Sequence, residues 1–198
     1  SISKFDYRPD CNNKLLYTFT DRSIGATSWN WEFGDGSTFS GQTPPAHSFP
    51  SNGTYVVSLT TSNGTCTYKH SRTIIVSDNI PDFTASAKEG CKSFTPTFTS
   101  TITDPQFITQ YLWNFGDGIE RDGGSSGSAS FTYTEAGNYN ITLITVDTFG
   151  CRHSVTKNNF IRVNGPEAYF SSLNNYGCKG MIPSFTDSTI TDGIHSIV

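Results

Sequence analysis

The chain has 198 residues and a net charge of −4 at pH 7, and only 34% of its residues are hydrophobic. It contains no basic run, so neither nucleic acid nor an anionic membrane is an expected partner. It also lacks a window of about 18 apolar residues, which a membrane span requires, and its first residues lack the apolar core of a signal peptide. We therefore expect an interior piece of a longer protein, with no membrane span in this fragment.

The composition favours strands and turns, because the chain is rich in Ser, Thr and Asn and has 18 Gly and 9 Pro. Residues 55–59 alternate apolar and polar side chains, as a strand with one buried face does. The Asn-Gly pair at 63–64 predicts a hairpin turn to a strand that reaches Val76. No stretch shows helical periodicity with caps. We expect six or seven short antiparallel strands in two layers, an all-β sandwich of immunoglobulin type.

The sequence WEFGDG combines the end of a strand with a sharp turn. Trp31 and Phe33 are two residues apart, so both side chains should point into the core. Gly34 and Gly36 allow the turn, and the Asp35 carboxylate can accept hydrogen bonds from nearby backbone amides. The same combination returns in the second half of the chain as Trp113, Phe115, Gly116, Asp117 and Gly118.

The chain is organised as repeats of about 80 residues, the size of a small domain. Residues 1–78 and 79–164 form two full copies, and 165–198 form the amino-terminal part of a third. The second copy also carries a Gly/Ser-rich insert at 123–128, which we expect to be a mobile loop.

The combined pattern resembles the PKD (polycystic kidney disease) domain. In the first copy the WEFGDG motif ends at Gly36. It is followed by Pro44 or Pro45, by His47 and Phe49, and then by the strand that begins at Gly53. The resemblance implies tandem immunoglobulin-like sandwiches of PKD type, arranged as beads on a rod. It further implies extracellular proteins in which these domains act as spacers, adhesion modules or accessory domains of secreted hydrolases. The cysteine-containing copies are most similar to PKD arrays of Bacteroidota cell-surface and gliding-motility adhesins.

The cysteines occupy two recurring positions, one in the first inter-strand loop and one after the last hairpin turn. Disulfides are expected rather than a metal site, since no CxxC spacing is present. In an immunoglobulin-like sandwich these two positions lie at opposite poles, about 25 Å apart, whereas bridged Cα atoms lie about 6 Å apart. We therefore favour an inter-domain bridge from Cys11 to Cys151, with the partner of Cys178 outside the fragment. The alternative is Cys11–Cys66 with Cys91–Cys151, and free thiols also remain open.

Other candidate sites are weaker. Some PKD domains of bacterial collagenases bind calcium, so Asp35 and Asp117 are weak calcium candidates, although a turn-stabilising role explains both. His47 is expected to pack or hydrogen-bond, since the histidines share no ligand spacing. An aromatic ligand surface remains open at the less regular positions Tyr7, Tyr17, Tyr68 and Phe107.

The sequence indicates a module without catalytic activity or cofactor, because no GxSxG, HExxH or phosphate-loop motif is present. We expect a stiff extracellular stalk of a large cell-surface adhesin, with a gliding-motility role as the narrower form of this expectation. Its partners would be neighbouring PKD repeats of the same chain, and an unknown surface, glycan or protein ligand at a distal site. The alternative is an accessory, substrate-binding module of a secreted hydrolase.

Overall fold

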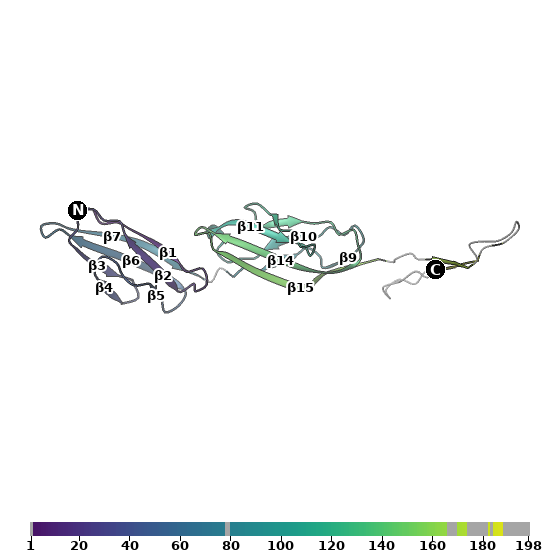
Figure 1. Cartoon of the computed structure of the whole chain (residues 1–198), viewed down its shortest axis with the longest axis horizontal. Helices are drawn as coiled ribbons and strands as arrows, with labels where there is room; N and C mark the ends of the chain where they lie inside the picture. Colours follow the sequence, from purple (N-terminus) through teal and green to yellow (C-terminus); the bar gives the residue numbers. More distant parts are fainter. Residues whose placement is uncertain (1, 78–79, 166–169, 174–181, 183, 188–198) are drawn as a thin grey trace. The chain divides into compact units, whose positions relative to one another are not determined.

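The structure is a computed structural model, and it describes residues 2–77, 80–165, 170–173, 182 and 184–187 (Figure 1). Within these ranges the regular structure is β-strand, apart from a single 3-10 turn, η1 (Pro105–Phe107). The chain divides into two compact units. The first contains Ser1–Ile80, Ile102–Thr109 and Thr145–His153, and the second contains Pro81–Thr101, Gln110–Ile144 and Ser154–Val198. The all-β prediction is confirmed.

Two antiparallel sheets form the sandwich of the first unit. One has the strand order β1 (Phe5–Pro9), β2 (Leu16–Asp21), β5 (His47–Ser48); the other has the order β4 (Thr38–Ser40), β3 (Ser28–Glu32), β6 (Gly53–Ser62), β7 (Thr67–Val76). The register of β3 and β6 places Trp31 opposite Leu59, and both side chains are completely buried. The hairpin turn predicted at 63–64 lies between β6 and β7.

Two sheets also carry the second repeat. One has the order β13 (Ser128–Ser130), β10 (Thr97–Ser100), β8 (Phe83–Ala85); the other has the order β12 (Arg121–Asp122), β11 (Ile108–Asn114), β14 (Gly137–Asp147), β15 (Arg152–Asn164), β9 (Glu89–Cys91). The expectation of antiparallel pairing is wrong for one pair, because β9 runs parallel to β15. The segment between the first two strands of this repeat contains β9, which lies beside the last strand, β15, and runs in the same direction.

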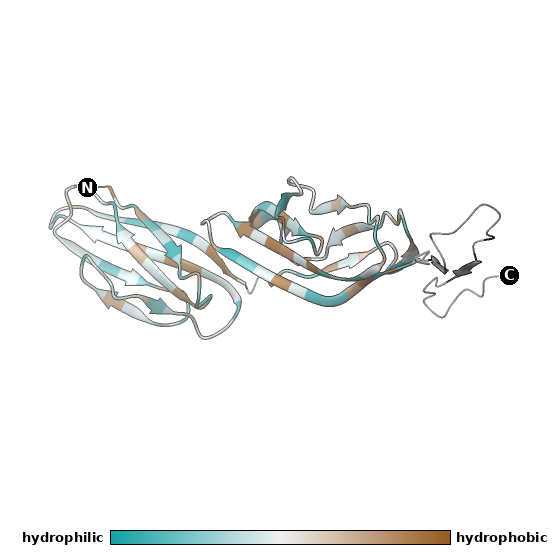
Figure 2. Ribbon diagram, turned by 45° about the vertical axis from the view of Figure 1, so that its right-hand side comes forward, coloured by the Kyte–Doolittle hydropathy of each residue, from teal (hydrophilic) through white to brown (hydrophobic). Residues whose placement is uncertain are grey.

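Apolar and polar residues alternate along the strands, visible in Figure 2 as bands of brown and teal. The repeated aromatic residues lie in the core. The rings of Trp31 and Phe33 stack at 6.4 Å, and those of Trp113 and Phe115 stack at 6.1 Å. All four side chains are at most 3% exposed. The predicted core role of the two motifs is therefore confirmed.

The repeated tyrosines Tyr55 and Tyr139 are only partly buried. Each hydroxyl donates to the backbone carbonyl four residues earlier, at Ser51 (2.9 Å) and Glu135 (2.8 Å). The ring packs inward while its polar tip reaches the surface, which is the usual compromise for a tyrosine.

The Gly/Ser-rich insert is anchored at both ends. The Gly123 amide donates to the carbonyl of Tyr111, and the Gly127 carbonyl accepts from the amide of Ser100, both at 2.8 Å. These bonds extend the two sheets into the insert, which ends in strand β13. The expected loop over 123–128 is thus held to the two sheets at its ends.

One strand pairing recurs three times along the chain. Phe5 pairs with Asp21 in β1 and β2, Phe83 with Ser100 in β8 and β10, and Phe170 with Asp187 in β16 (Phe170–Leu173) and β17 (Ser184–Asp187). Phe5 and Phe83 are completely buried, whereas Phe170 is 74% exposed. The rest of the expected third copy, Cys178 included, lies outside the described residues.

Candidate functional site

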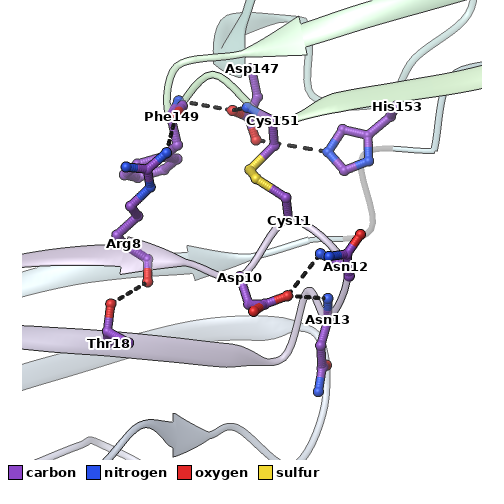
Figure 3. Close-up of a disulfide and its surroundings, with 10 residues drawn as sticks. All are labelled: Arg8, Asp10, Cys11, Asn12, Asn13, Thr18, Asp147, Phe149, Cys151 and His153. Carbon is purple, nitrogen blue, oxygen red and sulfur yellow. Dashed lines mark hydrogen bonds and ion pairs between the residues drawn. A yellow bond between two sulfur atoms is a disulfide. The ribbon is translucent and has the colours of Figure 1, made fainter.

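The cysteine-linked pole of the first unit is the candidate site. We define it as the loop between β1 and β2, residues 10–15, together with the tip of the β14–β15 hairpin, residues 145–153. Both segments belong to the first compact unit. A disulfide joins Cys11 to Cys151, with 5.2 Å between the Cα atoms and 140 residues between them in sequence (Figure 3). Cys151 is only 2% exposed, so the bond is shielded on the hairpin side.

An aspartate fixes the backbone on each side of the bond. The Asp147 carboxylate accepts hydrogen bonds from the amides of Phe149 (2.8 Å) and Cys151 (2.9 Å). The Asp10 carboxylate accepts from the amides of Asn12 (2.8 Å) and Asn13 (2.9 Å). Side chains of this type stabilise turns by binding backbone groups two or three residues away. Both cysteines are therefore presented on preformed turns (Figure 3).

Aromatic and polar contacts support the disulfide. The ring of Phe149 lies 5.6 Å from that of Tyr7, and the Arg8 guanidinium donates to the Phe149 carbonyl at 3.4 Å. The His153 ring lies 3.8 Å from the Asp147 carboxylate. The contacts of Phe149 with Tyr7 and Arg8 are difficult to predict, because they join residues at least 141 positions apart in the sequence.

A cavity of about 120 Å³ lies beside the disulfide, lined by Tyr7, Tyr17 and Phe107 among others. Ligand pockets for small molecules are typically about 300–1,000 Å³, so this cavity is too small for a sugar or peptide. Burial, followed by the proximity of Tyr7 and Asp147, raises the pKa of Tyr17 to about 12, so its hydroxyl stays protonated at neutral pH. Of the four aromatic residues left open as a ligand surface, these three line the cavity, and Tyr68 is 44% exposed.

The first glycine-aspartate turn is closed by a histidine–carboxylate contact under an aromatic stack. His47 Nε2 lies 2.7 Å from Asp35 Oδ2, and the two side chains are only 15% and 8% exposed. The His47 ring stacks on Phe33 at 4.0 Å. Asp35 also accepts from the Ser37 amide at 2.9 Å. Burial acts to raise the pKa of Asp35, but the hydrogen bonds from Ser37 and His47 outweigh it and hold that pKa below its usual range.

The second turn uses a different partner for its aspartate. Asp117 pairs with Arg121, with 2.6 Å between Oδ2 and the guanidinium, and it accepts from the Ile119 amide at 3.1 Å. The hydrogen bonds from Arg121 hold the pKa of Asp117 below its usual range, against the smaller opposing effect of burial. Phe131 stacks on Phe115 at 4.8 Å, and the Arg121 guanidinium lies 4.9 Å from the Phe131 ring centre. The role of Arg121 was not predicted, although its four-residue spacing from Asp117 could have suggested it.

Both calcium candidates are thus occupied by protein partners. Among the residues that the structure describes, no group of three or more His, Cys, Asp or Glu side chains could hold a metal ion. Gly34 shows why the turn needs glycine: its φ is +84°, and a Cβ there would lie 2.8 Å from the Val56 backbone. Such a conformation and such a contact exclude other side chains without rearrangement.

A family model described as PKD domain matches residues 11–76 and 79–163. The chain belongs to the PKD domain family. Members of this family are generally non-catalytic modules and are typically extracellular. In the described part of the chain, no helix is long and apolar enough to cross a membrane.

Solved structures give distant likenesses. A PKD domain of an M14-like peptidase from Thermoplasmatales archaeon SCGC AB-540-F20 is 22% identical, with a TM-score of 0.33, over 40% of this chain and 92% of that one. Fibronectin(III)-like modules of Clostridium thermocellum CbhA are 16% identical, with a TM-score of 0.40, over 75% and 85%. A carbohydrate-binding module of the β-sandwich superfamily is 21% identical, with a TM-score of 0.37. The match covers 54% of this chain and 51% of that one, so this chain spans about half the length of the matched protein.

The other described cysteines of the PKD repeats, Cys66 and Cys91, are free and exposed. The alternative pairing of Cys11 with Cys66 and of Cys91 with Cys151 is therefore absent from the structure. Cys11 is the first residue of the first PKD match and Cys151 lies within the second, so the observed bond connects the two repeats covalently.

Proposed function

We propose that this chain is a non-catalytic repeat segment of a large extracellular protein, in which successive PKD repeats form a stiff stalk of a cell-surface adhesin. Gliding motility is the proposed setting. The proposed repeats are residues 1–78, 79–164 and the beginning of a third at 165–198. The stalk holds a distal site for a surface, glycan or protein ligand away from the cell.

The observation that carries the proposal is the Cys11–Cys151 bond. A disulfide inside one sandwich protects that sandwich, whereas this bond connects two repeats. Tension applied to the chain before Cys11 and after Cys151 passes through the sulfur atoms and bypasses the residues between them. This arrangement suits a segment that transmits force.

The surroundings of the bond favour a structural role over ligand binding. The two cavities that adjoin the bond, of about 120 and 250 Å³, are both smaller than typical ligand pockets of about 300–1,000 Å³. The polar groups at the pole mostly bind the protein's own backbone, as the Asp10 and Asp147 carboxylates do. Disulfides persist in oxidising surroundings, which agrees with an extracellular location.

The test is to treat intact source cells with trypsin and to sequence the released peptides and the parent polypeptide by mass spectrometry. Peptides of this chain should be released without lysis, and the parent should carry many further FGDG repeats. A cytosolic protein, absent from the released fraction, is the control. A parent of ordinary enzyme size that ends in a catalytic domain would instead assign these repeats to an accessory role in a hydrolase.

A further inference from the structure

Cys66 and Cys91 occupy the same positions in their repeats as the bonded cysteines do in theirs. Cys66 follows the last hairpin turn of the first repeat, as Cys151 does in the second. Cys91 lies in the first inter-strand segment of the second repeat, as Cys11 does in the first. Both thiols are free and exposed.

The hairpin before Cys66 presents its cysteine as the bonded hairpin does. The Cys66 amide donates to the Asn63 side chain at 2.8 Å, and the Asn63 amide donates to the Cys66 carbonyl at 3.2 Å. At the bonded hairpin the Cys151 amide donates to the Asp147 side chain at 2.9 Å, and the Asp147 amide donates to the Cys151 carbonyl at 3.0 Å. The two turns are thus closed by the same pair of hydrogen bonds.

The first-loop cysteines are also alike, because each lies where the last strand of its repeat ends. Cys91 is in register with Asn164 at the end of β15, and the Lys92 amide donates to the Asn164 carbonyl at 3.1 Å. Cys11 lines one cavity together with Ser77, which directly follows β7. In the first repeat the group that meets the cysteine at this place is a hairpin cysteine, Cys151. The observed bond shows that a first-loop cysteine at this place can form a disulfide with a hairpin cysteine.

We propose that Cys66 and Cys91 are complementary half-sites for the same bond, each of which joins its repeat to the neighbouring repeat of the array; a second copy of this chain can supply that neighbour in solution. The inference rests on the proposed function, in which each repeat is bridged to a neighbour, and a second copy presents the required hairpin. The two thiols lose two protons and two electrons as the sulfur–sulfur bond forms. A small disulfide such as glutathione disulfide accepts them and becomes two thiols.

This bond lacks the supporting contacts of the observed one. Counted from the shared phenylalanine, Ala85 and Ser86 stand where the first repeat has Tyr7 and Arg8. The residues between Asn63 and Cys66 include no aromatic side chain comparable to Phe149. A Cys66–Cys91 bond should therefore be reduced at a lower concentration of reductant than the Cys11–Cys151 bond, since exposed disulfides are the more labile ones.

The test uses two full-length variants that differ in size by a tag. One carries Cys91→Ser and Cys178→Ser and keeps only the Cys66 thiol. The other carries Cys66→Ser and Cys178→Ser and keeps only the Cys91 thiol. Equal amounts are mixed with glutathione disulfide, and the products are separated on a non-reducing gel. Peptide mapping identifies the bonded cysteines, and the same mixture in urea provides the unfolded control.

In the folded mixture the heterodimer should exceed each homodimer by about tenfold or more, which is about fivefold above the random ratio and a preference of ~1 kcal/mol. In urea it should fall to the random excess of twofold. A random ratio in the folded mixture, a majority of homodimers, or no cross-linking would each overturn the proposal. These outcomes are independent of whether the parent protein is large and surface-exposed, so failure here is distinguishable from failure of the proposed function.

Discussion

The Cys11–Cys151 bond makes a quantitative prediction about mechanical extension. The perturbation is reduction of this single bond, by a reducing agent or by the Cys11→Ser/Cys151→Ser variant. With the bond intact, a chain pulled from its two ends can extend only through the residues before Cys11 and after Cys151. With the bond broken, the whole chain can extend.

The magnitude follows from the loop that the bond closes. It spans a sequence separation of 140 residues, and its ends are 5.2 Å apart in Cα position. An extended residue contributes about 3.3–3.6 Å, so reduction should add about 460–500 Å to the fully extended length. The alternative bridges from Cys11 to Cys66 and from Cys91 to Cys151 would together hide only about 390 Å at the same length per residue.

Single-molecule force spectroscopy with handles at the two termini measures this difference directly. The contour length at complete unfolding is compared for the oxidised and reduced forms of the protein. The double serine variant is the control, and its contour length should not change on addition of reductant. Equal lengths for the oxidised and reduced wild-type protein, or a gain near 390 Å, would refute the assignment of Cys11 to Cys151.

Three further predictions concern the stability of the repeats. Gly34→Ala should lower the free energy of unfolding more than Gly36→Ala, because a Cβ at Gly34 meets the Val56 backbone at 2.8 Å while one at Gly36 meets nothing within 4 Å. The left-handed conformation alone costs each variant about 1–2 kcal/mol. Equal losses in urea titrations would contradict the steric argument. Thr145→Val should leave stability unchanged or raise it by about 1 kcal/mol, because the buried Thr145 hydroxyl has no protein partner; a clear loss in the same titration would indicate a bound water. The pKa of Asp35 is lowered in the folded protein. Its ionised form should therefore stabilise the fold above the unfolded pKa of about 3.9, and this contribution should be lost as the pH falls through the folded pKa. Asp35→Asn should flatten the acid side of a profile of Tm against pH, and an unchanged profile would exclude the contribution.

The core could be predicted from the sequence because it depends on local periodicity. Trp31 and Phe33 are two residues apart in a strand, which determines the face of the sheet to which both side chains belong. The repeat then predicts the same for Trp113 and Phe115. The relation between the two cysteine positions could also be inferred, since it follows from which loops lie at which pole of a sandwich.

The contacts that depend on loop length could not be predicted. The loop before Cys91 is longer than the loop before Cys11, which allows β9 to add to the edge of β15 as a parallel strand. Aligning the repeats does not reveal that Arg121 replaces His47 as the partner of the turn aspartate, because Arg121 comes from another strand; only its four-residue spacing from Asp117 indicates the pair. Such contacts join residues whose distance in space depends on turns that no periodicity determines.

The arrangement of the cysteines also bears on why the bond connects repeats at all. Under the proposed pairing, the segment from Cys11 to Cys151 and the segment that begins at Cys91 overlap in sequence, because Cys91 precedes Cys151. Each stretch of an array would then lie beneath at least one bridge, so unfolding of one sandwich under tension would release less length than in an unbridged chain. A bond within each sandwich would leave every linker outside a bridge. The inter-repeat bond is therefore the pairing that limits extension along a whole array, which is the property that a stalk under load requires.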